Sequence, residues 1–119
     1  MAEFKELEEG EKAHNLTVAI YQLTRNFPEE ELLGLTQQLR LACSSIPIKI
    51  AQSCHREERS AQIELLQLAK DSSLELEYYL LLCYELELLS ELDYDHLVSS
   101  LVEVKELITT SIEKRQTNS

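Results

Sequence analysis

The stretch that decides the fold of this chain is L-E-L-E-Y-Y-L-L-L-C-Y-E-L-E-L-L, residues 74–89. Twelve of its sixteen residues are apolar, and neither glycine nor proline occurs between Ser60 and Leu89. Leucine and glutamate alternate at residues 74–77 and again at 85–88, a pattern that is also typical of a strand. Both residue types are strong helix formers, and no turn residue divides the stretch into strand lengths. The sequence therefore predicts one helix of about 30 residues, from Ser60 to about Leu89.

The polar residues of this helix do not gather on one face. At 100° per residue, its four glutamates point in four different directions, whereas a surface helix of a monomeric bundle keeps its polar side chains opposite the core. So much apolar surface needs more cover than three neighbouring helices provide, and a large exposed apolar patch usually marks an interface. We therefore expect self-association through this helix, unless it is the central, most enclosed helix of a monomer. The residues expected at the interface are Tyr78, Tyr79, Leu82, Tyr84 and Leu86.

Apolar residues spaced by three and four predict three further helices. The first covers about residues 3–26 and is clearest from Glu11 onward. The second begins at Pro28, because a proline followed by three glutamates favours a helix start, and extends to about Ser53. Pro47 lies inside this second helix and is expected to bend or divide it.

Two polar links complete the pattern. Ser60 is placed to cap the helix that it begins, and Ser90 or Asp93 is placed to cap a last helix. Four helices with short connections predict an all-α fold, an up-down-up-down four-helix bundle whose second helix is bent. We expect a single domain over residues 1–119, with frayed ends at 1–10 and 114–119.

The charge of the chain bears on its partners. Its 119 residues include 22 acidic and 11 basic side chains, a formal net charge of −11. Tight nucleic-acid binding draws most of its affinity from lysine and arginine on phosphates, so this balance disfavours it. The longest apolar run, seven residues from Tyr78 to Tyr84, is far shorter than the roughly 20 needed to cross a bilayer. Because the chain starts with Met1-Ala2 and a glutamate-rich run, we expect no secretory signal, no membrane association and a cytoplasmic protein.

Residues that could carry chemistry are few and scattered. The three cysteines, an odd number without C-x-x-C spacing, fit buried thiols better than disulfides or a zinc site. None of the three histidines has a cysteine or carboxylate at a spacing that metal sites use, and two glycines cannot build a phosphate-binding loop. We therefore expect no catalytic residue, no metal and no cofactor. The residues concerned are Cys43, Cys54, Cys83, His14, His55, His96, Gly10 and Gly34.

Several fragments, in order and at matching spacing, resemble a known family. The most specific is G-L-T-Q-Q-L-R, Gly34 to Arg40. The other fragments are Lys12-Ala13-His14, Ile20–Thr24, Phe27-Pro28 with Glu31, Ala42, Ser45-Ile46-Pro47, Ile50-Ala51, and Ala69, Ser72, Glu75 and Leu76. Over about residues 12–108 the chain is similar to the four-helix-bundle proteins encoded in intervening sequences of 23S ribosomal RNA.

The resemblance implies a four-helix bundle that assembles as a ring-like homopentamer. It also implies a relation to the accessory variability determinant of diversity-generating retroelements, a basic pentamer that works with a reverse transcriptase and its template RNA. The pentamer agrees with the self-association expected from residues 74–89, whereas the acidic charge of this chain differs from that of the basic relative.

Two functions follow as hypotheses. The first is a non-enzymatic homo-oligomeric scaffold or adaptor for a protein partner. The alternative is a nucleic-acid-binding accessory protein that works with a reverse transcriptase or ribosomal RNA. An enzyme would require a cleft that holds histidines from two chains. The basic residues that would contact nucleic acid are Arg25, Arg40, Lys49, Arg56, Arg59 and Lys70.

Overall fold

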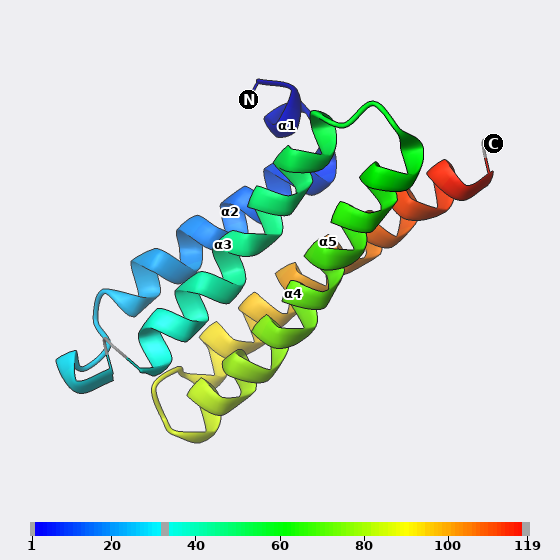
Figure 1. The fold of residues 1–119 in the computed structure, drawn as a ribbon. Helices are drawn as coiled ribbons and strands as arrows, with labels where there is room; N and C mark the ends of the chain where they lie inside the picture. The colour runs from blue at the N-terminus through cyan, green and yellow to red at the C-terminus, as the bar shows by residue number, and fades with distance from the viewer. Residues whose placement is uncertain (1, 32–33, 118–119) are drawn as a thin grey trace.

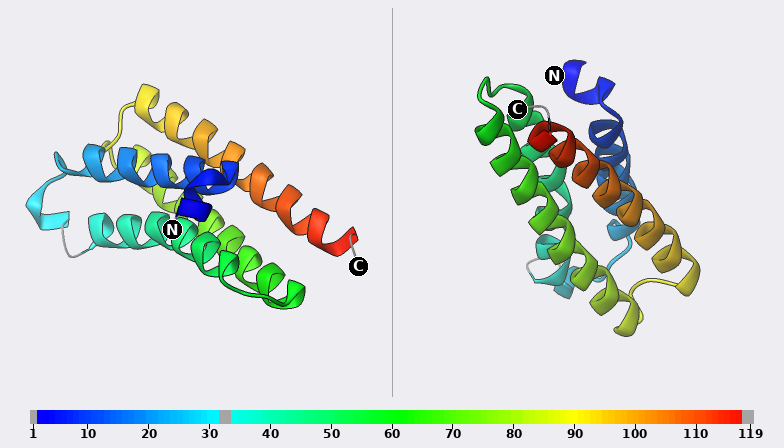
Figure 2. Two further views of the ribbon diagram at one scale, coloured as in Figure 1. Left: turned by 90° about the horizontal axis from the view of Figure 1, so that it is seen from above. Right: turned by 90° about the vertical axis from the view of Figure 1, so that its right-hand side faces the viewer.

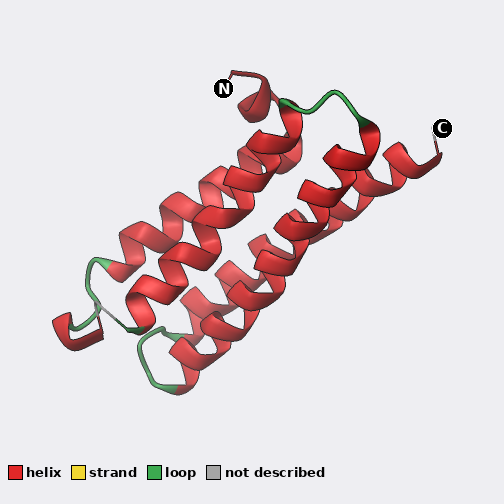
Figure 3. Cartoon of the chain, in the orientation of Figure 1, coloured by secondary structure: helices red, strands yellow, loops and turns green. Residues whose placement is uncertain are grey.

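The computed structural model describes residues 2–31 and 34–117 (Figure 1). Within these ranges every regular element is a helix and no strand occurs (Figure 3). The all-α fold predicted from the sequence is confirmed. The elements are α1 (Ala2–Glu6), α2 (Glu8–Thr24), the 3-10 helix η1 (Glu29–Glu31), α3 (Leu35–Cys54), α4 (Arg59–Glu85) and α5 (Glu91–Thr117).

The long helices α2 to α5 lie side by side, and consecutive ones run in opposite directions (Figure 1 and Figure 2). Helix α2 packs on α3 and α5, and α4 packs on the same two helices. The pairs α2–α3 and α4–α5 therefore form opposite sides of a rod that measures 48 × 22 × 21 Å. The α4–α5 turn lies at the same end of the rod as η1, whereas α1 and the α3–α4 link lie at the other end (Figure 1).

A single apolar core fills the space between the long helices. Each helix contributes residues at intervals of three and four, which is the periodicity expected of amphipathic helices. Burying one leucine or isoleucine side chain contributes about 1.5–3 kcal/mol, so this core accounts for the helix packing. The large side chains that are almost completely buried include Ile20, Leu39, Ile46, Ile50, Leu66, Leu76, Leu80, Leu101 and Ile108.

The first predicted helix is two helices, which corrects the single helix expected over 3–26. Leu7 separates α1 from α2 with an extended backbone, at φ −76° and ψ 137°. Helix α1 therefore returns across α2 and α3, and its Phe4 is buried. The return passes so close to Gly10 that a Cβ atom there would overlap the Phe4 carbonyl oxygen. Glycine at this position is what permits the contact.

The start of the second predicted helix at Pro28 is also wrong. The Glu31 amide donates to the Pro28 carbonyl (3.0 Å) and the Gly34 amide to the Glu31 carbonyl (3.1 Å). The first of these bonds spans three residues and belongs to the 3-10 helix η1, which stands where the first turn of an α-helix was expected. Helix α3 begins only after Gly34, at Leu35; the part of the predicted helix at residues 32–33 lies outside the described residues.

Pro47 lies inside α3, which is one uninterrupted helix over Leu35–Cys54. Because proline has no amide hydrogen, the Cys43 carbonyl four residues earlier lacks its usual helical donor. The Thr17 hydroxyl of α2 lies 3.2 Å from this carbonyl and 2.8 Å from the Ala13 carbonyl, so it offers a donor between the two helices. The predicted division of the helix is wrong, and the predicted bend stays a prediction.

Helix α4 ends at Glu85 and not near Leu89 as predicted. The Leu88 amide donates to the Cys83 carbonyl (2.8 Å) and the Glu87 amide to the Tyr84 carbonyl (3.0 Å). Together these bonds form a Schellman motif, in which Glu87 adopts the left-handed conformation at φ 64°. Continuing the helix would place Glu87 on the same face as the buried Leu80, where a carboxylate is costly.

The predicted helix caps have mixed outcomes. Ser60 is not a cap, because α4 begins at Arg59 and its N-cap residue is Glu58. Ser90 is a helix cap, because its hydroxyl accepts a hydrogen bond from the Asp93 amide (3.1 Å) at the start of α5. Residues 2–6 and 8–10 are helical and α5 extends to Thr117, while fraying of these ends stays a prediction. In the described residues, no helix has the length and hydropathy required to span a membrane.

Candidate functional site

Helix α4 is covered by its own chain on one face only. Its inner residues, such as Leu76 and Leu80, are completely buried. On the outer face, Leu74, Tyr78 and Leu81 follow one another at spacings of four and three and are 53%, 60% and 40% exposed. This outer stripe is the apolar surface that the composition of residues 74–89 predicts, and Leu74 and Leu81 were not among the interface residues expected from the sequence.

The five residues predicted at the interface do not lie on one face. Tyr78 and Leu86 are exposed, whereas Tyr79, Leu82 and Tyr84 are half-buried. Tyr79 packs against the core and meets Tyr78 edge to face, with ring centroids 6.1 Å apart. Tyr84 stacks on Tyr94 of α5 at 4.7 Å. Within the set, Tyr78 and Leu86 are therefore the residues most available to another molecule.

The outer stripe of α4 continues into a groove against α5. The groove is lined by Lys70, Leu74, Val102, Lys105 and Glu106, together with two threonines of α5. Lys105, which lines the groove, also forms an ion pair with Glu77 of α4. We call the exposed apolar residues of this side the α4–α5 face. They are Leu74, Tyr78, Leu81 and Val102.

The opposite side of the rod also exposes apolar residues. Leu41 and Ile48 of α3, seven residues apart, are 56% and 51% exposed, and two residues of α2 lie less exposed on the same pair of helices. A shallow apolar groove adjoins Ile48, where His14 and His55 lie near Pro47. We call the exposed apolar residues of this side the α2–α3 face. They are Val18, Tyr21, Leu41 and Ile48.

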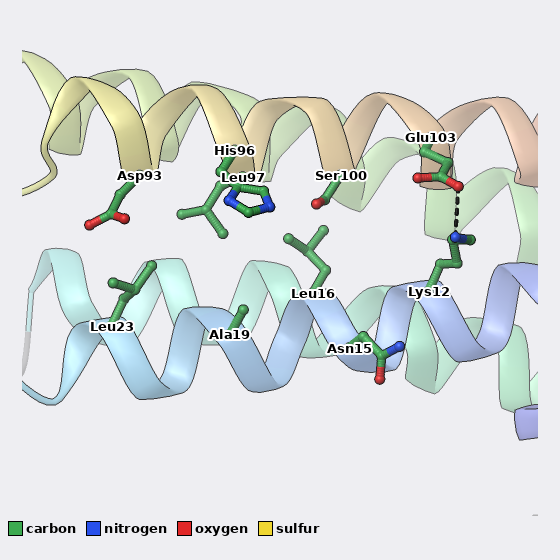
Figure 4. Close-up of a pocket in the computed structure, with 10 residues that line it drawn as sticks. All are labelled: Lys12, Asn15, Leu16, Ala19, Leu23, Asp93, His96, Leu97, Ser100 and Glu103. Carbon is green, nitrogen blue, oxygen red and sulfur yellow. Dashed lines mark ion pairs between the residues drawn. The ribbon is translucent and has the colours of Figure 1, made fainter.

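A third groove lies between α2 and α5 (Figure 4). Its apolar floor includes Leu16, Ala19 and Leu97, and an ion pair between Lys12 and Glu103 (2.8 Å) bridges the two helices. A hydrogen bond from Lys12 to Glu103 raises the pKa of the lysine amine above its usual value. Both side chains are well exposed, and pairs of this kind contribute little stability.

Side chains capable of acid-base chemistry share these grooves, but among the described residues no hydrogen bond links them into a set. Asp93, His96 and Ser100 share the α2–α5 groove, but the described residues show no hydrogen bond that joins any two of them. His14 and His55 lie on the α2–α3 side. Nor does the described part of the chain bring three metal-binding side chains together.

The three cysteines form no disulfide. Burial raises the pKa of the Cys43 thiol to about 12 and that of the Cys83 thiol to about 11. A thiol with so high a pKa is a poor nucleophile at neutral pH, because the thiolate is the reactive form. These two cysteines therefore act as small apolar core residues.

The basic residues considered for nucleic acid are spread over the molecule. Arg40 lies between α3 and α2, where it bonds to Thr24, while Lys70 lines the groove on the α4–α5 side. Arg56 and Arg59 are both exposed at the α3–α4 link. Lys49 is half-buried on α3. Arg25 is exposed at the end of α2, and of the six residues only Arg56 and Arg59 are near neighbours in the chain.

The long helices and their exposed faces define a helical bundle that presents apolar surface on two opposite sides. The chain belongs to the family described as 23S rRNA-intervening sequence protein, whose pattern it matches over residues 5–110. The family to which the sequence fragments pointed is thereby confirmed. Curated protein sequences give no match to the chain.

A solved structure shares this fold. It is the crystal structure of a protein with unknown function from the S23 ribosomal protein family of Bacteroides thetaiotaomicron VPI-5482. The two chains superpose with a TM-score of 0.82 over 88% of this chain and 95% of that one, at 22% sequence identity. At this identity the likeness concerns the fold alone.

Proposed function

We propose that this protein is a non-enzymatic homo-oligomeric scaffold or adaptor whose copies associate through their apolar faces. The observation that carries the proposal is the stripe of Leu74, Tyr78 and Leu81, which packing within one chain leaves exposed. Single exposed apolar residues are ordinary on protein surfaces, but a row of them along one helix is typical of an interface. A cytoplasmic location and a protein partner complete the proposal.

The two faces favour one mode of association. Because the α4–α5 face and the α2–α3 face lie on opposite sides, one face of each copy can dock on the other face of the next. Contacts between unlike faces are heterologous, and they form a ring when the rotation from one copy to the next closes and an open filament when it does not. The proposed assembly is a ring, a homopentamer by the family resemblance. Its subunit is an up-down-up-down four-helix bundle with α3 bent near Pro47.

Light scattering on the purified chain tests the proposal. The wild type is expected to have the mass of several chains, and a single-chain mass would refute association. Leu74→Glu on the α4–α5 face and Ile48→Glu on the α2–α3 face each place a charge in the interface, where burial is costly. Glu64→Gln, at an exposed position of α4, is the control and should leave the mass unchanged.

Mixing the two interface variants identifies the mode of association. If the contact joins unlike faces, Leu74→Glu still offers an intact α2–α3 face and Ile48→Glu an intact α4–α5 face. The mixture should then form a dimer of one copy of each, while each variant alone stays monomeric. If α4 instead pairs with α4 of a second copy, Ile48→Glu keeps the wild-type mass, and mixing the two variants produces no new species.

A second candidate function is an accessory role on nucleic acid, with ribosomal RNA or with a reverse transcriptase. What supports it is the exposed pair Arg56 and Arg59. Arg115 of α5 reaches the same end, because its Nε donates to the Gln62 side chain (3.0 Å), whose amide donates to the Arg56 carbonyl (2.7 Å). The net charge of −11 opposes this candidate.

Filter binding of a single-stranded RNA and of an RNA duplex, measured against salt, separates the two functions. If Arg56 and Arg59 contact phosphates, the logarithm of the binding constant falls steeply with the logarithm of the salt concentration. Changing both residues to glutamine should make this dependence less steep. Absence of binding at low salt, or a slope that both changes leave unaltered, excludes this role for the pair.

A further inference from the structure

Arg40 is held in a fixed position between α3 and α2. Its Nε donates to the Thr24 hydroxyl (2.8 Å) and its Nη2 to the Tyr21 carbonyl (3.4 Å). Its guanidinium carbon also lies 4.8 Å from the centre of the Tyr21 ring, within the range of a cation-π contact. Because α2 supplies all three contacts, little side-chain entropy remains to be lost when Arg40 binds a further group.

The charge of Arg40 has no counter-ion among the residues of its own subunit that the structure describes. The ion pairs among the described residues join Lys12 to Glu103 and Lys105 to Glu77, and Arg40 belongs to neither. A guanidinium has five N–H donors, and the two bonds to α2 use two of them. In a chain with 22 acidic side chains, an oriented arginine with donors to spare is complementary to a carboxylate from elsewhere.

The surroundings of Arg40 favour a protein carboxylate over a phosphate. Tyr21, beneath its guanidinium, and Leu41, next to it in the chain, belong to the exposed apolar α2–α3 face. Phosphate-binding surfaces instead gather several lysines and arginines, whereas of the other basic residues considered above only Arg25 is adjacent in the chain to a residue that Arg40 contacts. Arginine and tyrosine are both enriched among binding hot spots between proteins.

The outer stripe of α4 offers the matching group. Glu85 is exposed and follows Tyr78 and Leu81 at helical spacing, so it continues the stripe of the α4–α5 face. It is the last residue of α4, at the η1 end of the rod, and Arg40 lies about 8 Å into α3 from that same end. In a ring whose subunits point the same way, the two groups therefore lie at similar heights.

Building on the proposed scaffold function, we propose that Arg40 of one copy binds the Glu85 carboxylate of the next, so that this ion pair aligns the α2–α3 face with the α4–α5 face. The apolar residues of the two faces contribute most of the contact area. The ion pair fixes their register, because an arginine that is buried in the contact is costly unless a carboxylate of the other copy lies opposite it.

Sedimentation over a dilution series tests this pair. Arg40→Met removes the charge and keeps an apolar stem, and we expect the association constant to fall by about 30-fold or more, the range for losing one partner of a buried charge pair. Arg59→Met, an exposed arginine at the opposite end of the rod, is the matched control and should change it little.

Reversal of the charges provides the decisive comparison. Glu85→Arg lies at an exposed position, so the subunit folds, and it should weaken association as Arg40→Met does. The double variant Arg40→Glu, Glu85→Arg restores opposite charges and should recover association, and circular dichroism checks that it is folded. Glu57→Arg, at an exposed position of the α3–α4 link at the other end of the rod, should have little effect.

The outcomes separate this inference from the scaffold function. A wild-type chain of single-subunit mass would refute the scaffold and the ion pair together. An oligomer whose association is unchanged by Glu85→Arg would refute the ion pair and leave the scaffold intact. If Arg40→Met leaves the mass unchanged and abolishes RNA binding on filters, Arg40 serves a phosphate and the carboxylate assignment is wrong.

Discussion

Gly10 shows how one residue without a side chain sets the position of a helix. The Phe4 carbonyl of α1 occupies the space that a Cβ atom at residue 10 would need. Glycine has a lower helix propensity than alanine, but at this position it allows α1 to add the buried Phe4 to the core.

Gly10→Ala should therefore displace α1. The overlap leaves no room for small adjustments, because its nearest atoms belong to backbone, and we expect a loss of about 1–3 kcal/mol in the free energy of unfolding. Urea unfolding measures the loss, and limited proteolysis near Leu7 reports the release of α1. Gly34→Ala is the control, since a Cβ there meets its nearest atom at 4.0 Å. Equal effects of the two substitutions would contradict this role of Gly10.

The cysteines give a second prediction at this scale. At pH 8 the thiols of Cys43 and Cys83 are almost entirely protonated, because burial raises their pKa values to about 12 and about 11. We expect alkylation of the native protein by iodoacetamide to modify the half-buried Cys54 first. Peptide mass spectrometry locates the label, and Cys54→Ser should remove the fast phase. Modification of Cys83 at the rate of Cys54 would show that the core opens readily.

At the scale of the elements, the sequence predicts helices better than it predicts their ends. The apolar spacing predicts the long helices, because it reflects burial on one face, and the side chains predict Ser90 or Asp93 as the last cap, of which Ser90 is the one observed. The end of α4 was missed because the residue in the left-handed conformation is Glu87, where glycine is the usual signal. The sequence does not predict the break at Leu7, because the break depends on a tertiary contact, the packing of Phe4 of α1 into the core.

The Schellman motif at the end of α4 yields a prediction of stabilisation. Glu87 has a positive φ of 64°, which costs a residue with a side chain about 1–2 kcal/mol and costs glycine little. Glu87→Gly should therefore raise the free energy of unfolding by about 1 kcal/mol, measured in urea. Glu64→Gly, inside α4, should lower it by a similar amount because glycine is a poor helix former. A loss of stability in Glu87→Gly would show that the turn relies on the glutamate side chain.

Position on α4 also decides which substitution probes the interface. Tyr79 packs against the core, so a charge there damages the subunit as well as any contact between copies. Tyr78 is one residue away and 60% exposed, so Tyr78→Glu leaves the subunit intact and acts on association. Adjacent residues of one helix thus test different properties, which the sequence could not distinguish before the inner face of α4 was known.

For the molecule as a whole, the sequence indicated half of the candidate site. The excess of leucine and tyrosine in residues 74–89 pointed to α4 as an exposed apolar surface. The α2–α3 face was not expected, because Leu41 and Ile48 are spaced by seven residues just as core residues are. The same uncertainty applies to Arg40, whose position depends on Thr24 and Tyr21 of another helix.

Association between copies should be visible in the thermal stability of the wild type. A complex that binds the folded chain but not the unfolded one raises the melting temperature as concentration increases. Over a 100-fold range of protein concentration, we expect a rise of roughly 5 °C or more. Differential scanning calorimetry measures it, and the double variant Ile48→Glu, Leu74→Glu, which has a charge on both faces, should melt at one temperature throughout.

The comparison of these two chains separates stability of the subunit from stability of the ring. At the lowest concentration the wild type and the double variant should converge, because both substitutions lie at positions that are about half exposed in the subunit. A wild type whose melting temperature does not depend on concentration, at a level equal to that of the variant, would mean that the apolar faces stay in water. Another protein would then have to cover the exposed stripe of α4. Self-association would be refuted, and binding of a protein partner would be the part of the proposal that is left.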